Sequence, residues 1–125
     1  MMKFGVMSCN QGPPKNSRAN QAAKGKEHFQ KYCAVCHGQD GTGIIIDTMA
    51  IQPANLTLIN TSRRTNEFPI LEIANQIDGR KMSKYHGTRD MPVWGEVFSE
   101  NEALNETQIK GKLGEIIAYL MSIQR

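Results

Sequence analysis

The sequence predicts a small all-α domain with long, irregular loops, and three observations support this prediction. Apolar residues recur at helical spacing in three segments, one near the start, one in the middle and one at the end of the chain. The sequence shows no internal repeat and no convincing strand pattern. Its 125 residues suit one domain with one hydrophobic core. We therefore expect about three to five helices packed around a single centre.

The first 20 residues are expected to form a flexible tether, and residues 21–125 to form the domain. The stretch "SCNQGPPKNSRAN" is polar and contains a Pro-Pro pair. The apolar part of "MMKFGVMSC" is far shorter than the roughly 7–15 residues of an export-signal core, so this start is interpreted as the remnant of such a signal. "VMSC" also resembles the lipobox of bacterial lipoproteins, with Cys9 as the lipid acceptor. A free thiol in a tail is the alternative interpretation.

The first helix is expected to run from about residue 20 into the cysteine pair. Gly25, Phe29 and Tyr32 recur there at helical spacing. The following segment, 38–66, contains glycines and Pro53 and has no clean periodicity. A loop of that length is unusual in a compact domain unless it is functional. We therefore expect this segment to wrap a ligand.

Two further helices are predicted in the second half of the chain. The stretch "FPILEIANQIDG" indicates a helix that Gly79 ends, and a polar loop follows as far as Pro92. The last helix is expected from about 106 to 123, because Asn105 and Gln108 form a capping-box pattern at its start. The apolar faces of these two helices comprise Ile70, Ile73, Ala74 and Ile77, and Ile109, Leu113, Ile116, Ile117 and Leu120.

The sequence "CAVCH" places two cysteines and a histidine close together, and three chemistries use such a pattern. A redox disulfide of the thioredoxin type requires a neighbouring βαβ pattern, which the sequence does not show. A structural zinc site requires four ligands, and the remaining candidates, Cys9, His28 and His86, are poorly spaced for it. Cys-x-x-Cys-His is also the attachment pattern of c-type haem, and this interpretation is favoured.

Helical geometry explains why a covalent haem needs this spacing. Cys33 and Cys36 share one face of a helical turn, so that each can form a thioether with a haem vinyl group. His37 then lies under the ring and gives a nitrogen to the iron. We therefore expect one covalently bound haem c, with His37 as the first axial ligand.

The second axial position of the iron is assigned to Met91, with His86 as the main alternative. A thioether ligand raises the reduction potential, whereas an open position binds small ligands. The chain between His37 and Met91 is long enough to reach the opposite face of the ring. Pro92 disfavours helix at Met91 and so favours an extended strap. The other methionine candidates are Met49 and Met82, and the other interpretations of His86 are a propionate contact and a surface position.

With these residues in place, the chain resembles the class I cytochromes c, monohaem electron carriers of bacteria, from about Ala22 to Gln124. Gly25 and Phe29 match the glycine and the aromatic residue that precede the attachment motif in that family. Tyr119 matches the aromatic residue of the last helix that crosses at this glycine, where the missing side chain permits close approach. The resemblance implies a small cytochrome c fold.

The resemblance also implies roles around the haem. Pro53 matches a proline whose neighbourhood hydrogen-bonds the second nitrogen of the ligating histidine. "DMPVWG" is similar to the MPxWG segment of one bacterial branch, in which the methionine is the distal ligand; Trp94 would then pack near the haem edge. Apart from the resemblance, Arg89 of the basic loop before Met91 is expected to contact a haem propionate. The apolar run Ile44–Ile46 departs from the family pattern; core packing is the preferred interpretation, and haem packing and a contact patch are the alternatives.

Charge and length narrow the class of partner. The formal charge of +3 is too mild for a nucleic-acid binder, and no apolar run approaches the roughly 20 residues that span a bilayer. Basic residues crowd the loop before Met91, and we expect them to steer an acidic partner towards the haem edge, solvated loops being the alternative. These residues are Arg80, Lys81, Lys84 and Arg89.

These observations predict an electron-transfer protein rather than an enzyme: a one-electron carrier between exported or membrane-bound redox proteins. Two alternatives remain, namely a small haem subunit of a larger oxidoreductase and a gas-binding or peroxidatic haem protein with a labile distal ligand. A periplasmic or otherwise exported location is expected, because the family's haem is attached outside the bacterial cytoplasm. Lipidation of Cys9 would add a membrane anchor.

Overall fold

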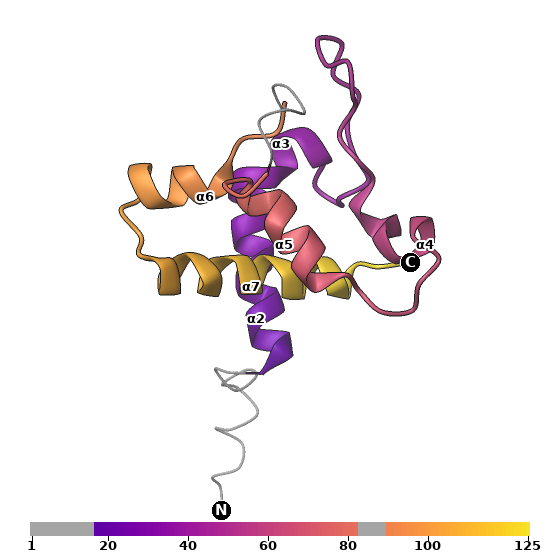
Figure 1. Cartoon of the computed structure of the whole chain (residues 1–125). Coiled ribbons are helices and arrows are strands. Elements are labelled where there is room, and N and C mark those ends of the chain that lie inside the picture. The colour runs from indigo at the N-terminus through magenta and orange to yellow at the C-terminus, as the bar shows by residue number, and fades with distance from the viewer. Residues whose placement is uncertain (1–16, 83–89) are drawn as a thin grey trace, which may run out of the picture.

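The computed structural model describes residues 17–82 and 90–125, and the regular elements of these residues are all helical (Figure 1). The predicted all-α fold is thus confirmed. The division of the chain at residue 20 stays a prediction, because residues 1–16 lie outside the described part. In chain order the elements are α2 (Arg18–His28), the π-helical turn η1 (Phe29–Cys33), α3 (Ala34–His37), the 3₁₀ turn η2 (Leu56–Leu58), α4 (Ile59–Ser62), α5 (Ile70–Asp78), α6 (Trp94–Glu96), the π-helical turn η4 (Val97–Asn101) and α7 (Glu106–Ser122).

The elements α2, η1 and α3 follow one another without a break and carry the cysteine pair at their end. The first helix begins slightly earlier than expected, because the side-chain oxygen of Ser17 caps it by accepting a hydrogen bond from the Asn20 N–H at 3.1 Å. In η1 the Ala34 N–H donates to the carbonyl oxygen of Phe29, which makes this turn wider than an α-helical one. Phe29 and Cys33, at the two ends of the wider turn, are both buried.

The crossing of α2 and α7 is the main helix–helix contact of the domain (Figure 1). Gly25 lies at this crossing, where a Cβ atom would come within 1.8 Å of the Glu115 carbonyl oxygen and 2.9 Å of the Tyr119 Cβ. The rings of Phe29 and Tyr119 meet beside it, with their centroids 5.2 Å apart. The predicted contact between the glycine and the aromatic residue is therefore confirmed, and it depends on the absence of a side chain at residue 25.

The core is built from one face of α7, with α5 packed against it. All five apolar residues predicted for the α7 face are buried, and the capping box of Asn105 and Gln108 is present with both hydrogen bonds at 2.9 Å. Gly79 ends α5 in the left-handed conformation, with φ at 76°. Ile73 and Ile77 of α5 are buried as expected, whereas Ile70, in its first turn, is half exposed.

Two stretches without a predicted element contain short helices. The turn η2 and helix α4 lie within the segment 38–66, where the side chain of Asn55 caps the first turn by accepting from the Thr57 N–H at 3.0 Å. The elements α6 and η4 follow Pro92 and bring Phe98 fully into the core. Each piece is only a turn or so long, which is too short for the apolar spacing to reveal it.

The chain between Gly43 and Pro53 leaves the body of the molecule as a long loop, drawn in purple and magenta at the upper right of Figure 1. One side chain closes this loop. Gln52 accepts from the Ile46 N–H at 2.7 Å and donates to the carbonyl oxygens of Ile46 and Met49 at 2.9 and 2.8 Å. The loop therefore has internal hydrogen bonds of its own, although it projects from the core.

Candidate functional site

The cysteine pair lies on the last turns of the first helical rod. Cys33 is buried and Cys36 is half-buried, and both thiols are free. Burial, together with the neighbouring Cys36, raises the pKa of Cys33 to about 12. The free Cys33 thiol is therefore protonated at neutral pH, which does not favour a redox nucleophile. Gly38, with φ at 81°, ends the helix directly after His37.

His37 is held in one orientation by a backbone group from the loop that follows. Its Nδ1 lies 3.0 Å from the carbonyl oxygen of Ala54. A carbonyl oxygen can only accept, so Nδ1 carries the proton and donates it, which leaves Nε2 unprotonated. Burial lowers the pKa of His37, and the hydrogen bond to Ala54 opposes this shift only in part. The result is a buried, neutral imidazole whose free lone pair is on Nε2.

Tight backbone contacts between the loop and α3 put Ala54 within reach of His37. The Gly43 N–H donates to the His37 carbonyl oxygen at 2.7 Å, and the Ile44 N–H donates to that of Cys36 at 3.1 Å. Gly43 has φ at 99°, and a Cβ there would lie 2.9 Å from the carbonyl oxygen of Pro53. The resemblance predicted Pro53 near the histidine. Pro53 directly precedes Ala54, whose carbonyl oxygen accepts the hydrogen bond from His37.

The two remaining described candidates, Met91 and Trp94, lie just before and at the start of α6. Met91 is half-buried and packs against the core. The Trp94 ring packs against two aromatic neighbours, with its centroid 5.2 Å from that of Tyr32 and 5.9 Å from that of Phe98. Tyr32 precedes Cys33, so Trp94 lies in an aromatic cluster beside the attachment helix. Two further candidates, His86 and Arg89, lie outside the described residues.

A family model described as "Cytochrome C oxidase, cbb3-type, subunit III" matches residues 20–105. The chain belongs to this family of c-type cytochromes. The match covers the cysteine helix, His37 and Met91, and it implies covalently bound haem c with iron as the cofactor and electron transfer as the chemistry. No curated protein and no solved structure matches the chain.

The residues at the attachment motif of this cytochrome fit a covalent haem better than a bare metal ion. Two free thiols lie one helical turn apart, and the neutral imidazole that follows them has its lone pair on Nε2. Among residues 17–82 and 90–125, no three side chains of the metal-binding types come together. Cys33, Cys36 and His37 would therefore hold haem c, which supplies one-electron chemistry when bound.

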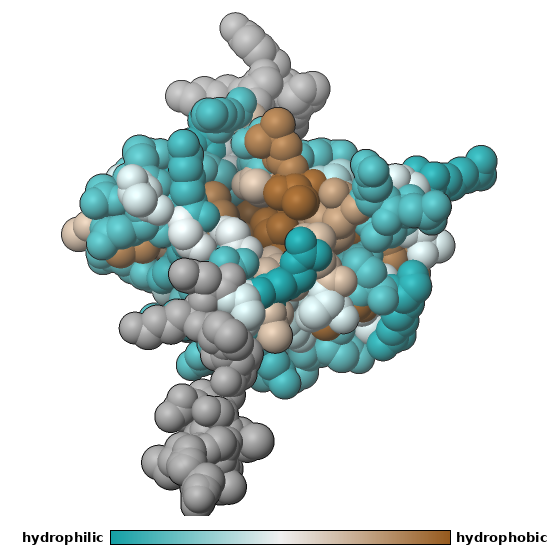
Figure 2. Space-filling model, turned by 90° about the horizontal axis from the view of Figure 1, so that it is seen from below, coloured by the Kyte–Doolittle hydropathy of each residue, from teal (hydrophilic) through white to brown (hydrophobic). Residues whose placement is uncertain are grey.

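Apolar surface is exposed near this motif and elsewhere on the chain. Val35, between the two cysteines, is 78% exposed, and Ile45 of the projecting loop is 82% exposed. Figure 2 shows apolar surface gathered near the middle of one face, with hydrophilic surface around it. The preferred interpretation of the run Ile44–Ile46 as core is wrong for Ile44 and Ile45, which both lie exposed because the loop projects from the body.

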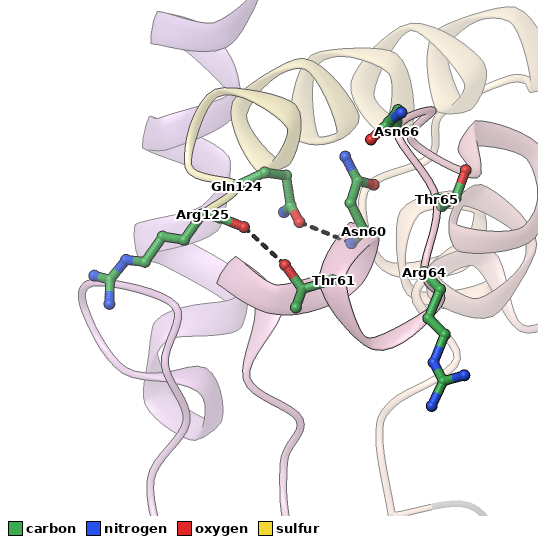
Figure 3. Close-up of a pocket in the computed structure, with 7 residues that line it drawn as sticks. All are labelled: Asn60, Thr61, Arg64, Thr65, Asn66, Gln124 and Arg125. Atoms are coloured by element: carbon green, nitrogen blue, oxygen red, sulfur yellow. Dashed lines mark hydrogen bonds between the residues drawn. The ribbon is translucent and has the colours of Figure 1, made fainter.

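A polar hollow of about 450 Å³ lies away from the predicted site (Figure 3). It is lined by residues of α4, of the turn after it and of the C-terminal end, among them Asn60 and Arg125. The Oδ1 atom of Asn60 is buried and has no hydrogen-bond partner in the structure. None of the predicted site residues lines the hollow, so it is separate from the haem site.

Two side-chain clusters near the site were not predicted from the sequence. Lys112 donates to Glu102 at 2.7 Å and to the Tyr32 hydroxyl at 3.0 Å, and its ammonium group lies over the Tyr32 ring. Arg80 makes ion pairs with Asp78 and Glu106. Spacing along the chain gives no signal for either cluster, because partners such as Arg80 and Glu106 come from different elements.

The Arg80 ion pairs also bear on the expected basic surface. The charge of Arg80 is compensated by Asp78 and Glu106, so this residue does not add to an attractive field as a free cation would. Lys81 is exposed. Lys84 and Arg89 lie outside the described residues, and the steering of an acidic partner stays a prediction.

Proposed function

We propose that this chain is a one-electron carrier whose haem c is attached at Cys33 and Cys36 and whose iron is held by His37 and Met91. The observation that carries the proposal is the buried His37, which follows the two free thiols in the sequence. Its Nδ1–H group donates a hydrogen bond to the carbonyl oxygen of Ala54. This bond fixes the ring plane and keeps Nε2 available to the iron. Pro53 is proposed to position the carbonyl group that bonds the second nitrogen of His37, while Trp94 would pack at the haem edge and Arg89 would contact a propionate.

In this proposal, the chain's own residues hold the haem and orient its ligands. Cys33 and Cys36 hold the cofactor on the rod α2–α3, and the hydrogen bond from His37 prevents rotation of the imidazole. Haem c held by His37 and Met91 would supply one-electron chemistry with little movement of these two side chains. A thioether ligand at Met91 would raise the reduction potential relative to a second imidazole.

Spectra and mass of protein matured with the haem-attachment machinery test this proposal. We expect the mass of the polypeptide plus one haem, and a low-spin ferric spectrum with the weak near-infrared band of iron bound to a methionine sulfur. Met91→Ala should abolish this band. Three control variants should keep it, namely Met49→Ala, Met82→Ala and His86→Ala. Loss of the band in any of the three control variants instead would refute Met91 as the ligand, and a mass without haem would refute the proposal itself.

A second candidate function is that of a haem subunit within a larger oxidase, which the matching family, an oxidase subunit, favours. The two candidate functions predict different copurification of the protein. A free carrier elutes alone from gently solubilised native membranes or soluble fractions, whereas a subunit co-elutes with a haem-containing oxidase complex at constant ratio. A gas-binding protein would instead bind carbon monoxide readily in the ferrous form.

The location and partners proposed for this chain follow from its family. Within the described residues, no helix has the length and apolar character needed to cross a bilayer. We propose that the domain works in the periplasm or at another exported location, with redox proteins as partners. A lipid anchor at Cys9 would be detected as an added mass on the N-terminal peptide, and an unmodified thiol there would refute it. Association rates that did not depend on ionic strength would refute an acidic partner.

A further inference from the structure

Arg80 is bound by two carboxylates that belong to different helices. Its guanidinium group donates to Asp78 through Nε at 2.7 Å and Nη2 at 3.0 Å, and to Glu106 through Nη1 at 2.7 Å and Nη2 at 3.1 Å. Asp78 is the last residue of α5 and Glu106 is the first residue of α7. Each pair is bidentate, and bidentate arginine–carboxylate pairs combine strength with a fixed geometry.

The backbone of α6 packs directly against this ion pair. Gly95 is buried, and a Cβ on it would come within 2.1 Å of Asp78 Oδ1 and 2.3 Å of Arg80 Nε. The side chains of Asp78, Arg80 and Glu106 and the Cα of Gly95 therefore join three helices at one point, and we call this group the clasp. Because the contact leaves no room for a side chain, the glycine after Trp94 has a physical role here.

The clasp lies at both ends of the chain segment that carries Met91. Arg80 follows the end of α5, and Gly95 lies in the helix that Met91 precedes. Closing a segment at its two ends restricts the positions that a residue between them can reach, which lowers the entropy lost when that residue binds a fixed partner. The packing of Trp94 in its aromatic cluster also fixes the C-terminal end of the segment that carries Met91.

We propose that the clasp is a positioning device that holds the Met91 sulfur against the haem iron. This inference rests on the proposed ligation by Met91, and it assigns to Arg80 a role beyond that of a surface ion pair. Isolated surface pairs contribute little. Here the arginine side chain is only 27% exposed, and it contacts two carboxylates and a backbone. A lysine would keep the charge and lose the planar fork that bridges the two helices.

The chain offers a matched control. Arg63 donates to Glu72 of α5 through Nε at 3.2 Å and Nη2 at 2.6 Å, so it too makes a two-nitrogen contact with a carboxylate of the same helix. This pair lies at the opposite end of α5 from the clasp, and it involves neither α6 nor the segment that carries Met91. Arg63→Gln therefore removes a comparable ion pair without touching the clasp.

The test compares Arg80→Gln, Arg80→Lys and Arg63→Gln as purified haem-loaded proteins. Imidazole is titrated into the ferric form, where it competes with methionine for the iron, and guanidinium unfolding is measured on the same samples. If the clasp holds Met91, Arg80→Gln should bind imidazole roughly tenfold more tightly than the wild type, Arg80→Lys should be intermediate, and Arg63→Gln should be unchanged. Gly95→Ala should behave like Arg80→Gln, because it forces the ion pair apart.

Each outcome decides one of two questions. Equal imidazole affinity in Arg80→Gln and Arg63→Gln overturns the clasp proposal, and so does a change in affinity that only follows the loss of global stability across all variants. If Met91→Ala keeps the near-infrared sulfur band, the proposed ligation has failed and the clasp proposal falls with it. If Met91→Ala loses the band while Arg80→Gln matches the control, only the clasp proposal has failed.

Discussion

The two sides of the proposed haem site are held by different kinds of contact. On the His37 side, the groups that fix the imidazole lie within 17 residues of it: the Gly43 and Ile44 N–H groups donate to the helix end, and the Ala54 carbonyl oxygen accepts from His37. On the Met91 side, side chains from distant parts of the chain do this work, namely the clasp and the aromatic cluster around Trp94. The difference suggests that the first side is set by local geometry and the second by the packing of helices.

Removing the imidazole should have the largest effect on this comparison. We expect His37→Ala to lose the low-spin ferric spectrum and to reduce the yield of haem-loaded protein by more than the about 10–100-fold that changes around a ligand cause. The absorption spectrum and the mass of the product measure this effect. His28→Ala is the control, because His28 lies on the same rod and bonds to Glu115 at 2.8 Å, away from the attachment motif. A low-spin spectrum retained by His37→Ala would contradict the assignment.

A smaller change can loosen the His37 side without removing the ligand. In Gly43→Ala, the new Cβ would meet the carbonyl oxygen of Pro53 at 2.9 Å, and the positive φ of 99° is unfavourable for alanine. We expect a loss of about 1–3 kcal/mol in the free energy of unfolding, measured with denaturant on the haem-loaded protein. The hydrogen bond from His37 to Ala54 should weaken with it, which would raise the reduction potential, because a less basic imidazole stabilises ferric iron less. Stability equal to that of the wild type would show that the loop does not need its tight approach.

The sequence revealed the local features of the fold and missed the ones that depend on packing. The capping box of Asn105 and the stop at Gly79 were read correctly because their signals lie within one helical turn. The crossing at Gly25 came from a resemblance, since spacing alone does not say which helix approaches a glycine. The π-helical turns and α6 left no periodic signal, because they are short and are stabilised by tertiary contacts.

The same division holds for the candidate site. Cys33, Cys36 and His37 could be predicted because covalent attachment imposes a fixed local spacing. The acceptor Ala54 could be expected only through the proline before it, and the pairing of Arg80 with Glu106, 26 residues further on, could not be expected at all. The roles of these residues towards haem, and that of Met91, stay predictions until a haem-loaded protein is measured.

Acid should weaken the Met91 side through Asp78. Hydrogen bonds from the Arg80 side chain hold the pKa of Asp78 in the folded protein below its ordinary value. The stability that this carboxylate contributes is therefore fully present above the pKa of an unfolded aspartate, about 3.9. It is lost as the pH falls through the lower pKa of the folded state. Because Asp78 is partly exposed, we expect the loss to be below about 1 kcal/mol. Asp78→Asn should flatten the dependence of unfolding free energy on pH in this acid range, and an unaltered acid profile in that variant would contradict the pairing.

A substitution far from both sides should leave the iron site unaffected, and it tests whether the glycines named above are special. Gly111 lies within α7, and a Cβ there would meet nothing within 4 Å. Gly111→Ala should therefore raise the unfolding free energy by roughly 0.5–1 kcal/mol, because alanine loses less backbone entropy than glycine in a helix. Denaturant unfolding measures this gain, and the imidazole affinity of the ferric protein should not change. If Gly111→Ala altered the imidazole affinity as much as Gly95→Ala, the effect at residue 95 would be a general response to substitution. The Met91 side, with its clasp, would then not differ from the rest of the helical frame.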